Sequence, residues 1–159
     1  MDFSYEDLAI DPTPAALLET GKFDLHLALP PNEPIQINSS LPTFIYNYYK
    51  VDPLWHKEEL GNRILLLEPS FFDLYPVSKR CIDFMLALSK NIIGIQIYVG
   101  SFEAFVNQYQ VSDIYYKEHP LHAGYKGKEE PRDWIATQVT GYFPSFFSYW
   151  KKVEKLLEK

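Results

Sequence analysis

The sequence is poor in cysteine and in long hydrophobic runs. Cys81 is the single cysteine among 159 residues. It excludes an internal disulfide and any metal site built from several thiolates, and it suits a reducing compartment. No stretch approaches the roughly 20 apolar residues that a membrane-spanning helix needs. Because the N-terminus also lacks the basic start and apolar stretch of a signal peptide, we expect a cytoplasmic protein that does not enter the membrane.

Signatures of classical nucleotide and hydrolase chemistry are also missing. No Gly-x-Gly-x-x-Gly follows a strand-like run, and GYKGK at 124–128 lacks the spacing and the hydroxyl of a phosphate-binding loop. No serine sits in a Gly-x-Ser-x-Gly elbow. His119 and His122 lie in a loop that no carboxylate motif completes, so we expect no metal there. The residues alone therefore identify no catalytic group.

Acidic charge is concentrated at the start of the chain. The net charge of −6 comes from 21 acidic and 15 basic residues. Residues 1–42 hold seven of the acids and one lysine, whereas residues 43–159 hold fourteen residues of each sign. A protein that binds DNA by its phosphates normally carries a basic excess on one face. This distribution disfavours unaided DNA binding, and any contact with DNA is expected to be indirect.

The first 42 residues read as an extended acidic leader or linker. They hold six of the twelve prolines, which remove backbone donors and disfavour helix in the preceding residue. Only a short helix around 15–19 is plausible there. Such a segment either packs along the surface of a domain or links it to another domain. We therefore divide the chain into a leader, residues 1–42, and a folded domain, residues 43–159.

Four strand-like runs follow the leader. They are rich in aromatic, aliphatic and β-branched residues and occupy 43–49, 63–68, 94–99 and 113–118. Runs that are apolar on both sides indicate a sheet that is covered on both faces. Residues 124–133 are polar and contain glycine, which predicts a loop.

Between these runs lie segments whose apolar residues recur at helical spacing. The apolar stripe of the first predicted helix consists of Val77, Cys81, Phe84, Met85 and Leu88, so we expect Cys81 to be a buried structural thiol. A second helix is expected from Ser101 to Tyr109, and an amphipathic helix ends the chain at 146–157. Alternation of strands and helices predicts an α/β fold, an open and mostly parallel Rossmann-like sheet with helices on both faces.

Ligands of open parallel sheets bind beyond the carboxyl ends of the strands. The predicted strand ends carry carboxylates, a lysine, an imidazole and, at Ser101, a helix N-terminus that is able to receive an anion. The alternative is a purely structural role, in which Glu68, Lys117 and Glu118 pair with each other and His119 caps a turn. The candidate ligand-binding residues are Glu68, Ser70, Gly100, Ser101, Glu103, Lys117, Glu118 and His119.

Aromatic residues make up 16% of the chain and crowd its C-terminal part. Such a cluster forms part of the core, meets another domain, or stacks on a flat chromophore. The candidate domain-interface residues are Tyr142, Phe146, Phe147 and Trp150.

An ordered series of segments resembles a known family. The series is NRILLLEPSFFDLYPVSKRCIDFMLALSKN, then IQIYVGSFEAF, IYYKEHP and GYFPSFFSYWKKVEK. It resembles the α/β domain of the DNA photolyase and cryptochrome family, and more closely the α/β portion that follows the FAD-binding helical domain in certain bacterial photolyase-related proteins. The likeness covers about residues 40–157, and none of its segments is a catalytic motif.

The resemblance implies a division of labour within a flavoprotein. In this family the all-helical domain binds FAD and performs light-driven DNA repair or photoreception, while the α/β domain packs against it and in some members holds an antenna chromophore. This chain would be related to deoxyribodipyrimidine photo-lyase without containing the catalytic helical domain. The FAD would be held by that partner, fused or separate, and we assign no catalytic residue. The alternative is a small-molecule or nucleotide-binding α/β protein that uses the same strand ends.

Overall fold

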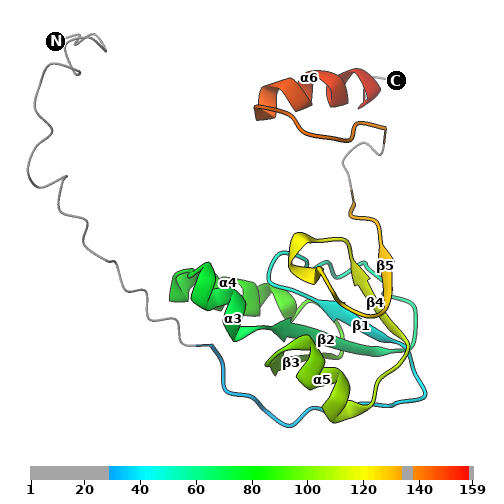
Figure 1. Ribbon diagram of the computed structural model, residues 1–159. Coiled ribbons are helices and arrows are strands. Elements are labelled where there is room, and N and C mark those ends of the chain that lie inside the picture. The colour runs from blue at the N-terminus through cyan, green and yellow to red at the C-terminus, as the bar shows by residue number, and fades with distance from the viewer. Residues whose placement is uncertain (1–28, 134–137, 158–159) are drawn as a thin grey trace, which may run out of the picture.

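Five parallel strands form the centre of the chain in the computed structural model, which describes residues 29–133 and 138–157 (Figure 1). The strand order is β3-β2-β1-β4-β5, and every pairing is parallel. This confirms the predicted α/β, Rossmann-like sheet. The strands are β1 (Thr43–Tyr46), β2 (Asn62–Leu67), β3 (Ile95–Val99), β4 (Ile114–Lys117) and β5 (Lys128–Glu130).

Helices connect the strands and cover both faces of the sheet. They are α3 (Pro69–Leu74), α4 (Lys79–Ser89), α5 (Phe102–Tyr109) and the short 3-10 helix η1 (Pro120–His122). A further helix, α6 (Phe146–Leu157), follows the last strand. The chain proceeds outward from β1 to β2 and β3, then returns through α5 to β4 on the other side of β1. The direction of the connections therefore changes between β1 and β4.

Side chains of the central strands alternate between two hydrophobic clusters. From β1, Phe44 and Tyr46 enter a cluster with α3 and α4, while Ile45 enters a cluster with α5. In β2, Leu65 and Leu67 join the first cluster, and the residues between and before them join the second. Both faces of the sheet are thus apolar, as strands of a parallel sheet require.

Helix α4 buries a different stripe from the one that the sequence predicted. Ser78 caps the helix by accepting a hydrogen bond from the backbone N–H of Cys81. The buried residues are Ile82, Met85 and Ser89. Of the predicted stripe Met85 is buried as expected, whereas Phe84 and Leu88 are exposed. Most of this helix is apolar, so spacing alone did not fix its rotation. The prediction of a buried thiol is wrong, because Cys81 is exposed.

Strand β5 lies within the predicted loop 124–133. Its sequence, Lys-Glu-Glu, has low strand propensity, and it forms only because it pairs with β4, Tyr115 opposite Lys128. Gly127 permits the close approach: a Cβ there would lie 2.7 Å from the carbonyl oxygen of Ile114.

The central strand β1 is shorter than predicted. It stops at Tyr46 rather than continuing to residue 49, because Asn47 Oδ1 accepts a hydrogen bond from the N–H of Tyr49 and turns the chain.

The described part of the predicted leader, residues 29–42, runs as extended chain against the domain. Leu29 packs on the cluster beneath α4, and Ile35 and Ile37 pack on the cluster beneath α5. Helix α3 was not predicted, and the expected helix at 15–19 lies outside the described residues. In the described ranges no helix is both long and apolar enough to span a membrane.

The predicted C-terminal helix is confirmed as α6. Val153 is fully buried, whereas Phe146 is 63% exposed and Phe147 is also exposed. No residue of α6 belongs to either core cluster.

The burial pattern of α4 predicts opposite outcomes for two neighbouring substitutions. Met85 is 3% exposed and Phe84 is 64% exposed. We expect Met85→Ala to lower the free energy of unfolding by about 2–5 kcal/mol, because it leaves a cavity in the core. Phe84→Ala should change it by no more than about 0.5 kcal/mol. Urea unfolding of both variants measures this, and a larger loss for Phe84→Ala would contradict the observed rotation of the helix.

Candidate ligand-binding site

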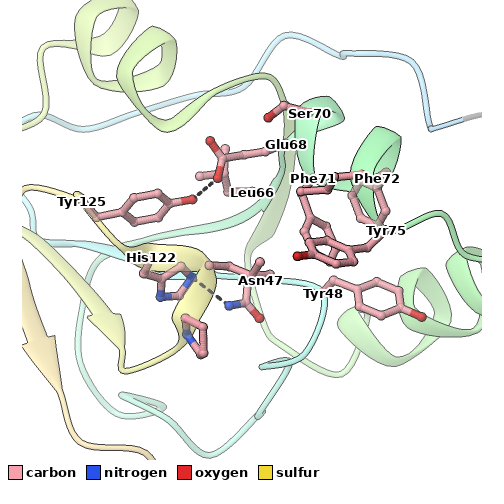
Figure 2. A pocket seen from close by; sticks show the side chains of 13 residues that line it. Asn47, Tyr48, Leu66, Glu68, Ser70, Phe71, Phe72, Tyr75, His122 and Tyr125 are labelled. Atoms are coloured by element: carbon pink, nitrogen blue, oxygen red, sulfur yellow. Dashed lines mark hydrogen bonds between the residues drawn. The ribbon is translucent and has the colours of Figure 1, made fainter.

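A cavity of about 490 Å³ lies at the carboxyl ends of β1, β2 and β4 (Figure 2). It occupies the place where the direction of the connections changes, the usual ligand position in open α/β sheets. Its size falls in the range of small-molecule pockets. The lining residues are Asn47, Tyr48, Leu66, Glu68, Ser70, Phe71, Phe72, Leu74, Tyr75, Pro120, Leu121, His122 and Tyr125.

Aromatic rings from α3 and from the turn after β1 form one wall of the cavity. Tyr48 meets Phe72 edge to face, with ring centroids 5.7 Å apart, and Phe71 meets Phe72 at 5.0 Å. Tyr75 contacts Phe71 at 5.4 Å. A wall of rings with few polar groups is typical of sites for flat organic ligands.

Glu68 is the carboxylate of the opposite wall and joins three elements. It follows β2, its Oε1 accepts a 2.9 Å hydrogen bond from the N–H of Phe102 at the start of α5, and its Oε2 accepts one from the hydroxyl of Tyr125. Figure 2 shows the Tyr125 ring pointing across the cavity toward this carboxylate. Burial, together with the hydrogen bond to Glu68 and the negative charge of Glu68, raises the pKa of Tyr125. The phenol therefore stays protonated and donates a hydrogen bond to the carboxylate.

Tyr125 is held by stacking as well as by this hydrogen bond. Its ring lies 3.9 Å from the ring of Phe102 and 4.7 Å from that of His122, nearly parallel to both. A residue from the loop before β5 is thereby fixed between α5 and η1. Contacts within the protein alone therefore hold this wall in place.

His122 forms the floor of the cavity as a neutral imidazole. Its side chain is buried, with 3% exposure, and burial lowers its pKa from 6.5 to about 4. Nδ1 lies 2.8 Å from the carbonyl oxygen of Lys117, which only accepts, so Nδ1 carries the proton. Nε2 is then the acceptor for the side-chain amide of Asn47 at 2.7 Å. Asn47 Oδ1 accepts from the N–H of Tyr49, which leaves the side-chain NH₂ of Asn47 to donate to His122. The amide orientation of Asn47 and the tautomer of His122 are therefore consistent with each other.

The candidates at the end of β4 lie beside the cavity and do not line it. Lys117 Nζ pairs with Asp133 at 2.9 Å, and Glu118 pairs with Arg132 at 2.6 Å. They thus make ion pairs with the segment after β5 and not with each other. His119 Nδ1 accepts the N–H of Leu121, so the expected turn cap is present.

The candidates at the end of β3 are dispersed. Ser101 caps α5 by accepting from the N–H of Ala104, and Glu68 already accepts the N–H of Phe102. The protein's own oxygens thus occupy the helix N-terminus where an anion was expected. Glu103 lines a separate hollow of about 240 Å³ beside α5, and Gly100 continues the pairing of β3 with β2. Of the eight candidates, Glu68 and Ser70 line the cavity.

Sequence reasoning missed most of the lining. It placed Asn47 inside the strand-like run 43–49, treated His122 only as a metal candidate and placed Tyr125 in the loop predicted at 124–133. Phe71 and Tyr75 belong to α3 and to the turn that ends it, which were not predicted. The single signal was their position just after a strand, EPSFFDLY at 68–75.

The described residues contain no group of three or more His, Cys, Asp or Glu side chains that is arranged to hold a metal ion. Comparison with known proteins adds no assignment: no protein family, no curated protein and no solved structure matches this chain.

The neutral state of His122 predicts a pH-dependent stability. As the pH falls below 6.5 the unfolded chain takes up a proton that the folded chain takes up only near pH 4, so acid favours unfolding. That difference in pKa corresponds to about 3 kcal/mol lost between pH 7 and pH 4. In His122→Gln this part of the slope should disappear. Unfolding by urea across that pH range measures both slopes, and parallel slopes would contradict a neutral buried imidazole.

Proposed function

We propose that this chain is the α/β module of a photolyase- or cryptochrome-like flavoprotein and that its strand-end cavity holds a flat antenna chromophore. The cavity is the observation that carries the proposal. It lies at the point of the sheet where ligands bind in open α/β folds, and five of its lining residues are aromatic: Tyr48, Phe71, Phe72, Tyr75 and Tyr125.

The chemistry of the cavity suits binding rather than catalysis. His122 is neutral with both nitrogens engaged, and the hydroxyl of Tyr125 donates a hydrogen bond to Glu68. Ser70 lines the cavity and is exposed to solvent, so it lies at the rim. No nucleophile among the described lining residues is activated by a free base. The module therefore positions a ligand, while the reaction of the whole flavoprotein belongs to a FAD-binding helical domain.

The exposed C-terminal aromatic residues support the existence of a partner. Tyr142 is 90% exposed, and Phe146 and Phe147 are also exposed, whereas Trp150 is partly covered and stacks on Phe146 at 5.9 Å. Large exposed rings that cluster on one segment mark surfaces for another domain. We assign this surface to the helical domain, which would also provide any contact with DNA.

Ligand binding by the isolated chain tests the proposal. Flavin mononucleotide serves as the planar probe and AMP as a nucleotide without an extended ring system. We expect FMN to bind saturably, measured by quenching of its fluorescence, and AMP to bind much more weakly. In Ser70→Trp the new ring would fill the rim of the cavity and weaken FMN binding by at least about tenfold, or 1.4 kcal/mol.

The matched control is Ser112→Trp, which places the same ring on an exposed position before β4, outside the cavity. It should leave FMN binding unchanged. Binding of AMP in preference to FMN would favour the nucleotide-binding alternative. If neither probe binds, and the purified protein retains no absorbance between 350 and 450 nm, the proposed chromophore site is wrong.

A further inference from the structure

The two edges of the sheet are protected in different ways. The outer strand β5 is three residues long and charged throughout, and charges on an edge discourage the addition of another strand. The opposite edge strand, β3, has the sequence IQIYV, which is uncharged and has high strand propensity. By sequence alone β3 is the edge at risk of pairing with another chain.

Residues 29–38, which we call the strap, cover this edge without forming a strand. The side-chain amide of Asn32 donates to the carbonyl oxygen of Val99 at 3.0 Å and accepts from its N–H at 3.2 Å. The side-chain amide of Gln96 exchanges the same two hydrogen bonds with the backbone of Gln36, at 2.8 and 2.7 Å. All four bonds are exposed to solvent, so water competes for the same groups and the bonds can open without unfolding the core. Besides these bonds, the strap is held by the packing of Leu29, Ile35 and Ile37 against the core clusters.

The strap does not satisfy the whole edge. The backbone N–H of Gly100 donates to the carbonyl oxygen of Leu67. By the alternation of a parallel pair, the backbone N–H and C=O groups of Tyr98 and Gly100 therefore point toward β2, and those of Ile97 and Val99 point away from it, to the open edge. Asn32 occupies Val99. The outward N–H and carbonyl of Ile97 have no hydrogen-bond partner among the described residues, and a cavity of about 270 Å³ separates β3 from the prolines of the strap.

We propose that the strap is a displaceable cover of the β3 edge and that its release lets β3 pair antiparallel with β3 of a second copy of this chain. A two-fold axis at Ile97 would pair Ile97 with its own counterpart and Ile95 with Val99. Ile97 would then exchange both of its free backbone groups, and no charged side chain on β3 opposes the pairing.

Two double variants test this with one shared change. Asn32→Ala with Gln96→Ala removes all four bonds of the strap. Asn32→Ala with Gln96→Lys removes three of these bonds, since a lysine still donates to the carbonyl oxygen of Gln36 but cannot accept from its N–H. It also places two lysines diagonally across the new pair, where like charges repel. We expect the first to form dimers whose fraction rises with protein concentration in light scattering after size exclusion. The second, like the wild type, should stay monomeric. A first variant that stays monomeric, or a second that dimerises equally, would overturn the proposal.

Hydrogen exchange in the wild-type chain gives a test that needs no substitution. The Ile97 amide faces the cavity, whereas the Tyr98 amide faces β2. We expect Ile97 to exchange faster than Tyr98 by about tenfold or more, because its N–H lacks a partner in the sheet. Equal protection of the two amides would show that the edge is already closed, and the proposal would be wrong.

Discussion

Burial of β1 and β2 on both faces is the constraint on which the rest of the structure depends. Phe44 and Tyr46 face one cluster and Ile45 faces the other, so helices must cover both sides of the sheet. Parallel strands need crossing connections, and these connections reverse direction beside β1. The cavity at the strand ends follows from that reversal. The same arrangement that buries the hydrophobic residues thus creates the candidate site.

The sequence predicted the class of fold because the strand runs are apolar on both sides, a pattern typical of parallel sheets covered by helices. It failed where tertiary contacts decide the outcome. Strand β5 is polar and exists through its partner β4, and α4 has apolar residues around most of its circumference, so packing alone determined that Met85 and not Phe84 is buried. Glu68 was found because it directly follows a strand, whereas Tyr125 reaches the site from a loop whose path no local pattern encodes.

The walls of the cavity are fixed by contacts that do not involve a ligand. Glu68 ties β2 to α5 and to Tyr125, and Asn47 ties the end of β1 to His122. Each polar group thus supports its neighbour while it lines the cavity. A preformed site of this kind loses little conformational entropy when it binds a rigid ring. These contacts support the proposal that the module holds a flat chromophore in one orientation.

The neutral floor of the cavity has one more consequence. Since the pKa of His122 is about 4, this imidazole keeps the same charge throughout the range in which cells operate. For the chromophore that we propose to bind here, no change in the charge of His122 would then shift its absorption maximum between about pH 5 and 8, the range in which a histidine with an ordinary pKa titrates.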